Sequence, residues 1–133
     1  MEEKQNKMAN IKSFRDLKAW QEAHKFVLLI YNLTKKFPSD EKFCLVPQIR
    51  RAVVSVSSNI AEGFGRYSAK DKMHFYNMAQ TSKIEVENQL LIAHDLKYID
   101  KNDYLGGIQQ ADLVGKLLTG IIKSVGSRCS PQP

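Results

Sequence analysis

The sequence predicts an all-α protein, an antiparallel up-down-up-down four-helix bundle that spans residues 13–125. Apolar side chains recur at steps of three and four along four segments, which is the spacing of one helix face. No alternating apolar run is long enough for a β-strand, and no hairpin turn signal is present. Short connections between the four segments make successive helices antiparallel neighbours.

The first helix should begin at Ser13, which can cap it together with Asp16 three residues later. It should end near Phe37, because Pro38 disfavours helical geometry in the residue before it. Residues 1–12 are mostly polar, and we expect them to form a flexible leader. The apolar stripe of this helix is expected at Leu17, Trp20, Ala23, Val27, Ile30, Tyr31 and Thr34.

The second helix should carry Pro47 in its first turn, where the missing N–H group costs nothing, and should end at Gly63 and Gly65. Ser68 and Asp100 are the expected caps of the third and fourth helices, and residues 126–133 form an expected flexible tail. The expected stripes are Ile49, Val53, Val56 and Ile60 in the second helix; Phe75, Ala79, Ser82, Val86, Gln89, Ala93 and Leu96 in the third; and Tyr104, Ile108, Ala111, Gly115, Leu118, Ile122 and Val125 in the fourth.

The second and third helices carry more small and apolar side chains than the surface of a monomer needs. Opposite the stripe of the second helix lie Arg51, Ser55, Ser58 and Glu62, at about 100° per residue. We therefore expect other subunits to cover these faces, the alternative being a wide core face within one chain. The apolar residues off the stripe of the third helix are Met73, Tyr76, Met78, Ile84, Leu90, Leu91, Ile92 and Ile99.

The charge of the chain permits a polyanionic partner. Twenty Lys and Arg residues against fourteen Asp and Glu give a net charge of +6. In an up-down bundle, Lys35, Lys36, Lys42, Arg50 and Arg51 gather at one end, and Arg66, Lys70 and Lys72 gather at the other. Such clusters suit phosphate contacts, and an ordinary solvated surface is the alternative. Without a base-reading motif, any binding of nucleic acid should depend on shape and charge.

The sequence offers no catalytic, cofactor or metal signature, so we expect a protein that is not an enzyme. His74 and His94 face opposite sides of one helix, and no HxxxH or HExxH spacing occurs. Glu85 and Glu87 do not share a helix face. The stretch from Gly63 to Arg66 follows a helix and lacks the phosphate-loop pattern.

The expected compartment is the cytoplasm. Cys44 and Cys129 are far apart and form no CxxC pair, which favours a reducing environment. No signal peptide is visible at the start of the chain, and the longest apolar run is too short to span a membrane.

Two polar residues near the end of the second helix are expected to be buried, within the chain or against another subunit. Asn59 lies about 90° from the core stripe and should bind backbone groups or Ser82. Glu62 should pair with Arg51 or Arg66. Ser58 is expected to lie in a subunit contact.

Four stretches carry motifs of a known family, namely Phe14–Gln21, Gln48–Ala52, Ser58–Arg66 and Ser82–Leu90. They resemble the 23S rRNA-intervening-sequence proteins, also called four-helix bundle proteins. The resemblance runs from Phe14 to Val125 and is most specific from Asn59 to Arg66. The family often has a proline where this chain has Ser57, so the usual kink need not form here.

The resemblance implies a bacterial cytoplasmic homopentamer without a defined catalytic activity. A related branch, the accessory proteins of diversity-generating retroelements, uses a basic pentamer to bind a reverse transcriptase and nucleic acid. We therefore expect a binding module for structured RNA or a ribonucleoprotein, such as a reverse transcriptase complex, the alternative being a protein–protein scaffold. The family positions that match are Arg50, Arg51, Asn59, Glu62, Arg66, Ser82 and Glu85.

Overall fold

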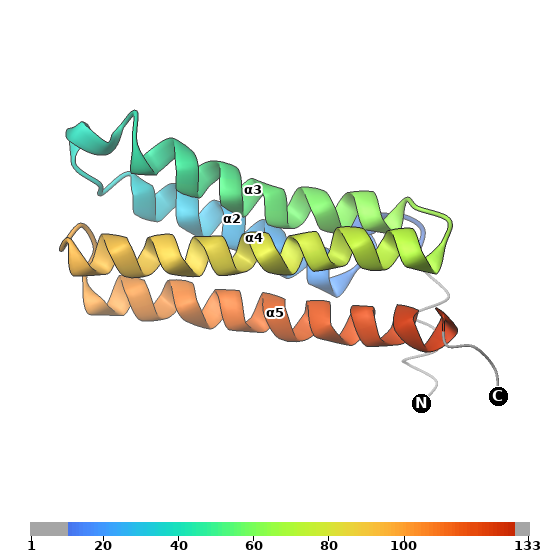
Figure 1. Ribbon diagram of the computed structural model, residues 1–133. Coiled ribbons are helices and arrows are strands. Elements are labelled where there is room, and N and C mark those ends of the chain that lie inside the picture. Colours follow the sequence, from blue (N-terminus) through green and yellow to red (C-terminus); the bar gives the residue numbers. More distant parts are fainter. Residues whose placement is uncertain (1–10, 130–133) are drawn as a thin grey trace.

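The computed structural model describes residues 11–129, and within that range the predicted all-α bundle is confirmed. The long helices lie side by side and alternate in direction (Figure 1). Both α2 and α4 pack on α3 and α5, which gives the up-down-up-down order. The elements are η1 (Phe14–Asp16), α2 (Lys18–Thr34), η2 (Ser39–Glu41), α3 (Leu45–Phe64), α4 (Ala69–Asp95) and α5 (Lys101–Cys129), where η denotes a single 3-10 turn.

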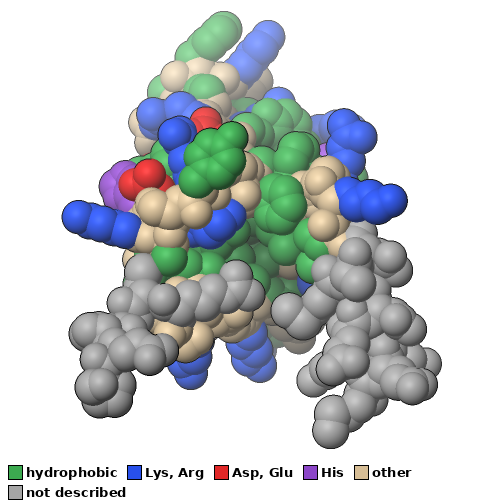
Figure 2. All heavy atoms as spheres, turned by 90° about the vertical axis from the view of Figure 1, so that its right-hand side faces the viewer, with side chains coloured by type: hydrophobic (Ala, Val, Ile, Leu, Met, Phe, Trp, Pro, Cys, Tyr) green, Lys and Arg blue, Asp and Glu red, His purple; other side chains and the backbone are tan. Residues whose placement is uncertain are grey.

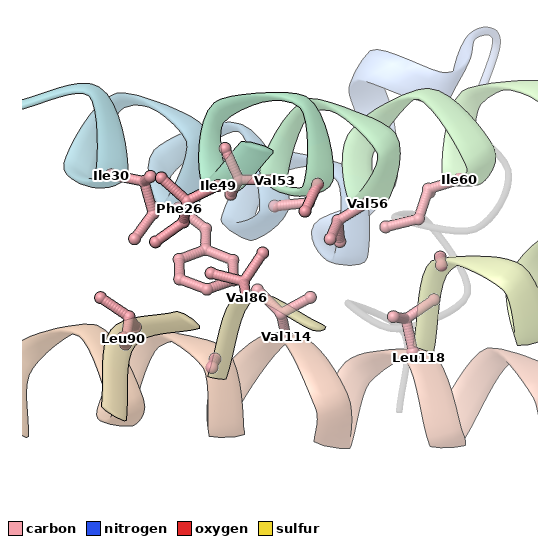
Figure 3. Packing of buried hydrophobic residues seen from close by; sticks show 14 of the residues in the cluster. Phe26, Ile30, Ile49, Val53, Val56, Ile60, Val86, Leu90, Val114 and Leu118 are labelled. Atoms are coloured by element: carbon pink, nitrogen blue, oxygen red, sulfur yellow. The ribbon is translucent and has the colours of Figure 1, made fainter. Parts of the chain in front are cut away.

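The core is a column of aliphatic side chains to which all four helices contribute. The predicted α3 stripe is correct, since its four members are fully buried. Figure 3 shows these side chains directed toward Phe26 and Ile30 of α2 on one side and toward Val86 and Val114 on the other. Each fully buried aliphatic side chain contributes about 1.5–3 kcal/mol of transfer free energy. The four α3 residues are Ile49, Val53, Val56 and Ile60.

The predicted stripe of the first helix is partly wrong. The buried positions include Ala19, Phe26 and Leu33, whereas Tyr31 is 38% exposed. Residues 26–30 are all apolar and cover every direction around the helix, so spacing alone could not select the core face. The Ser13 capping box is present, but it caps η1, and the extended backbone of Leu17 separates η1 from α2.

The helix boundaries follow the expected caps at three places. The hydroxyl of Ser68 accepts from the Asp71 N–H (3.1 Å), and the Asp100 carboxylate accepts from the Asp103 N–H (2.7 Å). Pro47 lies in the first turn of α3, and Gly65 follows its last residue.

The structure answers two questions about the helices, namely whether α3 bends at Ser57 and where α5 ends. Helix α3 is unbroken at Ser57, whose hydroxyl donates to the Val54 carbonyl (3.0 Å). Helix α5 continues to Cys129, so the expected tail does not begin at Gly126. The remainder of that tail, residues 130–133, and residues 1–10 of the expected leader lie outside the described residues.

A glycine inside α3 allows the close approach of α3 and α4. Gly63 is buried, and a Cβ atom placed there would lie 2.6 Å from Cε1 of Tyr76, whose side chain is itself buried. Any larger residue at this position must displace a packed aromatic ring.

We predict that Gly63→Ala destabilises the protein by about 1–3 kcal/mol, even though alanine favours helices. The matched control is Gly120→Ala in α5, where no heavy atom lies within 4 Å of the added Cβ atom. The control should raise stability by about 0.5–1 kcal/mol. Urea unfolding followed by circular dichroism measures both, and equal stabilisation by the two variants would contradict the packing argument.

One carboxylate of α2 is buried beside α5. The carboxylate of Glu22 lies 2.9 Å from the Lys25 ammonium group, and the Gln110 side-chain amide donates to the Glu22 backbone carbonyl (2.8 Å). The Lys25 ammonium group lowers the pKa of Glu22 below its ordinary value of 4.5. Because the folded state lowers this pKa, the contribution to stability is present above pH 4.5 and is lost as the pH falls below it.

We predict that Glu22→Gln reduces the loss of stability between neutral pH and about pH 3, because the variant has no carboxylate to protonate in that range. Lys25→Gln should have the same effect, since it removes the partner that lowers the pKa. Urea unfolding at several pH values measures the slope of the free energy of unfolding against pH. Slopes equal to that of the unmodified protein in both variants would show that this pair does not govern acid stability.

Candidate nucleic-acid interface

A surface groove of about 580 Å³ lies where the α2–α3 connection meets the first turns of α3. Three cations line it, namely Lys42, Arg50 and Arg51, and its lining contains no carboxylate. The predicted basic cluster at this end is thus found for these three residues. We call this feature the cationic groove; its other lining residues are Tyr31, Phe43, Val46, Pro47 and Val54.

Arg50 is held in place by contacts with α2. Its Nε donates to the Thr34 hydroxyl (2.8 Å) and its Nη2 donates to the Tyr31 carbonyl (3.4 Å). The guanidinium carbon lies 4.5 Å from the centre of the Tyr31 ring, within the range of a cation–π contact. Arg50 is therefore a preorganised cation, whereas Arg51 is exposed.

The other two predicted cations of this end do not line the groove. The Lys36 ammonium group pairs with Asp103 of α5 (2.8 Å), and this hydrogen bond raises the pKa of Lys36. Lys35 is exposed. Lys36 therefore ties α2 to α5, and part of its charge is neutralised within the chain.

At the opposite end, two of the three predicted cations have structural partners. Lys72 donates to the Phe64 carbonyl (2.7 Å) and to the Gly63 carbonyl (3.3 Å), where it satisfies the C-terminus of α3. Arg66 pairs with Glu62 (3.4 Å) and lies over the Phe75 ring. Lys70 is exposed. Figure 2 looks onto this end and shows Lys and Arg side chains around an exposed apolar surface.

The expected polar network is present between α3 and α4, with one additional member. The Asn59 amide donates to the backbone carbonyl (2.9 Å) and the hydroxyl (3.0 Å) of Ser55, and that hydroxyl is 2.9 Å from the Ser82 hydroxyl. Ser55 thus links Asn59 to Ser82. Sequence reasoning placed Ser55 on the outer face, but α4 packs close enough for its hydroxyl to reach Ser82.

The remaining residues of the expected interface face outward. Glu62 is exposed within the chain, so its expected burial by helices of its own chain is wrong, although its pairing with Arg66 is as predicted. Ser58 and Glu85 are exposed as well. Whether another subunit covers them stays a prediction.

The apolar side chains expected off the stripe of the third helix differ in burial, and Met73 and Met78 among them are half-buried. Tyr76, Leu90 and Ile99 are buried in the core of their own chain, so their expected place in a subunit contact is wrong. The alternative of a wide core face within one chain holds for these three. The exposed members are Ile84 (59%), Leu91 (44%) and Ile92 (41%).

Sequence reasoning missed a second, polar groove of about 380 Å³ between α4 and α5. In it, Gln80 donates to the Gly115 carbonyl (3.0 Å), and Lys83 pairs with Glu87 (3.4 Å). The i,i+4 spacing of Lys83 and Glu87 was the available signal. A Cβ atom placed at Gly115 would lie 3.0 Å from the Lys83 ammonium group, so this glycine leaves room for the Lys83 side chain.

The histidines have aromatic neighbours. His24 stacks on Trp20, His74 lies edge-on to Phe75, and His94 contacts Tyr104. Among the described residues, no three His, Cys, Asp or Glu side chains gather as metal ligands would. Over residues 11–129, no helix combines the length and apolar character needed to cross a bilayer.

Comparisons with known proteins support one family. The family model described as 23S rRNA-intervening sequence protein matches residues 15–120. A crystal structure of a protein of unknown function from the S23 ribosomal protein family of Bacteroides thetaiotaomicron superposes with a TM-score of 0.73 at 28% identity. The match covers 79% of this chain and 98% of that chain. No curated protein matches. From the matched range and the bundle, the chain belongs to the 23S rRNA-intervening sequence protein family.

Proposed function

We propose that this chain is a non-enzymatic, cytoplasmic binding protein that forms a homo-oligomer and associates with structured RNA or a ribonucleoprotein. The observation that carries the proposal is the cationic groove, in which Lys42, Arg50 and Arg51 converge without a carboxylate in the lining. Phosphate groups are the ligands that such a cluster attracts, and each contact releases condensed counterions. The mention of rRNA in the family's name also supports an association with RNA.

A protein–protein scaffold is the second candidate function. Several cations of the bundle ends have partners within the chain, as Lys36, Arg66 and Lys72 do, and they contribute less to an external field. Exposed apolar side chains on α2 and α4, such as Leu28 and Ile84, would suit a protein partner. Binding of RNA and its salt dependence separate the two functions.

We predict that the protein binds a structured RNA hairpin with an affinity that falls steeply as salt rises. The double variant Lys42→Gln/Arg51→Gln should reduce the log–log salt slope by about one unit per lost contact. The matched control, Lys18→Gln/Lys123→Gln, removes the same charge from exposed positions outside the groove and should change the slope less. Fluorescence anisotropy at several salt concentrations measures both.

Absence of RNA binding by the unmodified protein at low salt would favour the scaffold function. Equal slopes for the two double variants would mean that net charge, and not the groove, governs binding.

We predict a homopentamer of about 76 kDa, five times the 15.2 kDa of one chain. The exposed apolar residues of α4 support assembly, and the family resemblance provides the number five. Ser58→Arg should dissociate the assembly, because it would bury an unpaired charge in the contact. Gln109→Arg on α5 introduces the same charge at another exposed position and is the control.

Light scattering after size exclusion measures the mass. A monomer of the unmodified protein at micromolar concentration would overturn the proposed assembly. An intact Ser58→Arg oligomer would remove Ser58 from the contact and leave the assembly standing.

A further inference from the structure

Phe43 is the part of the cationic groove that phosphate binding alone does not use. It lies between η2 and α3, in the connection at the left end of Figure 1, and its side chain is 84% exposed. An aromatic ring in water is unfavourable, and a partner with a flat apolar face would cover it. The Lys42 ammonium group lies over one face of the ring, 5.6 Å from its centre, so a partner would cover the other face.

A second aromatic residue, Tyr31, also lines the groove together with its cation, Arg50. The Arg50 guanidinium lies over Tyr31, and its contacts with Thr34 and Tyr31 use two of its five N–H groups. The rigid fork of an arginine suits phosphate oxygens. The groove therefore combines an exposed ring with cations that are already in position.

We propose that the cationic groove binds an unpaired nucleotide of single-stranded RNA, with the base stacked on Phe43 and the phosphates against Arg50, Arg51 and Lys42. This inference rests on the proposed RNA association and specifies which part of an RNA the groove recognises. Every base has a flat π-face, so stacking of this kind tolerates any sequence. In a duplex those faces are already stacked on neighbouring base pairs, so Phe43 would discriminate in favour of single strands.

The charges of the groove favour RNA over an apolar partner. Its lining has three cations and no carboxylate, and a purely apolar segment would leave these cations without counter-charges. A nucleotide supplies a flat face and a negative charge within one unit, which are the two features that Phe43 and the neighbouring cations would bind. An acidic peptide supplies the charge without the flat face, so it serves as the competitor in the test.

The test compares two exposed aromatic residues at opposite ends of the bundle. Phe43→Leu removes the ring and keeps an apolar side chain, and Tyr67→Leu does the same for a fully exposed tyrosine in the α3–α4 connection. Neither substitution changes the net charge. The probes are a fluorescein-labelled oligouridylate of about 12 nucleotides and a blunt-ended RNA duplex of about 12 base pairs, both measured by anisotropy.

Phe43→Leu should weaken binding of the oligouridylate about 5- to 100-fold and leave binding of the duplex unchanged. The salt slope should stay the same, because no phosphate contact is lost. Tyr67→Leu should bind both probes like the unmodified protein. A glutamate peptide of matched charge should compete weakly with the oligouridylate.

Each of the other outcomes contradicts the proposed stacking on Phe43 and shows whether the proposed RNA association fails with it. If the unmodified protein binds RNA but Phe43→Leu keeps its affinity for the oligouridylate, the groove is not a stacking site and the proposed function stands. If the unmodified protein binds neither RNA, both proposals fail. Strong competition by the peptide, or a changed oligomer mass of Phe43→Leu, would assign the groove to a protein partner or to a second copy.

Discussion

The buried aliphatic column of α3 is the contact on which the rest of the molecule depends. Ile49, Val53, Val56 and Ile60 have no exposed surface, and all four point into the space between the other helices. Burial of these residues fixes the rotation of α3 about its axis. Once that rotation is set, Arg51 and Ser58 must face outward, and Arg50 must lie against α2. The position of the cationic groove is thus a consequence of core packing.

The basic residues of the bundle fall into two physical groups. Lys72 and Lys36 bind carbonyl or carboxylate groups of neighbouring helices, so their charges contribute to the fold. Arg51 and Lys42 line a groove without such a carboxylate, so their charges are directed to solvent or to a partner. The count of 20 Lys and Arg residues therefore overstates how many cations the surface offers to a polyanion. The distribution of partners decides which cations can act in recognition.

The sequence was sufficient for the bundle because its strongest signal was periodic. The α3 stripe has a single 4-3-4 solution, and its prediction was correct, whereas five consecutive apolar residues in α2 fit several solutions. The candidate site was harder to predict from the sequence than the bundle. Phe43 lies in a connection without periodicity, and the Lys36–Asp103 pair joins residues that are far apart in the sequence. Tertiary pairing determines which lysine is neutralised, and helix spacing contains no information about it.

The separation of structural from exposed cations also determines how binding can be studied. A substitution at Lys72 removes hydrogen bonds to the carbonyls of Phe64 and Gly63, so a loss of RNA affinity there would mix unfolding of α3 with loss of a phosphate contact. Arg50 has the same difficulty because it bonds to α2. Arg51 and Lys42 are exposed in the groove. Phe43 is also exposed, and it carries no charge that could alter the field of the protein. Substitutions at these three positions should change the binding of RNA without changing the stability of the fold, because the core column and the helix caps do not depend on their side chains.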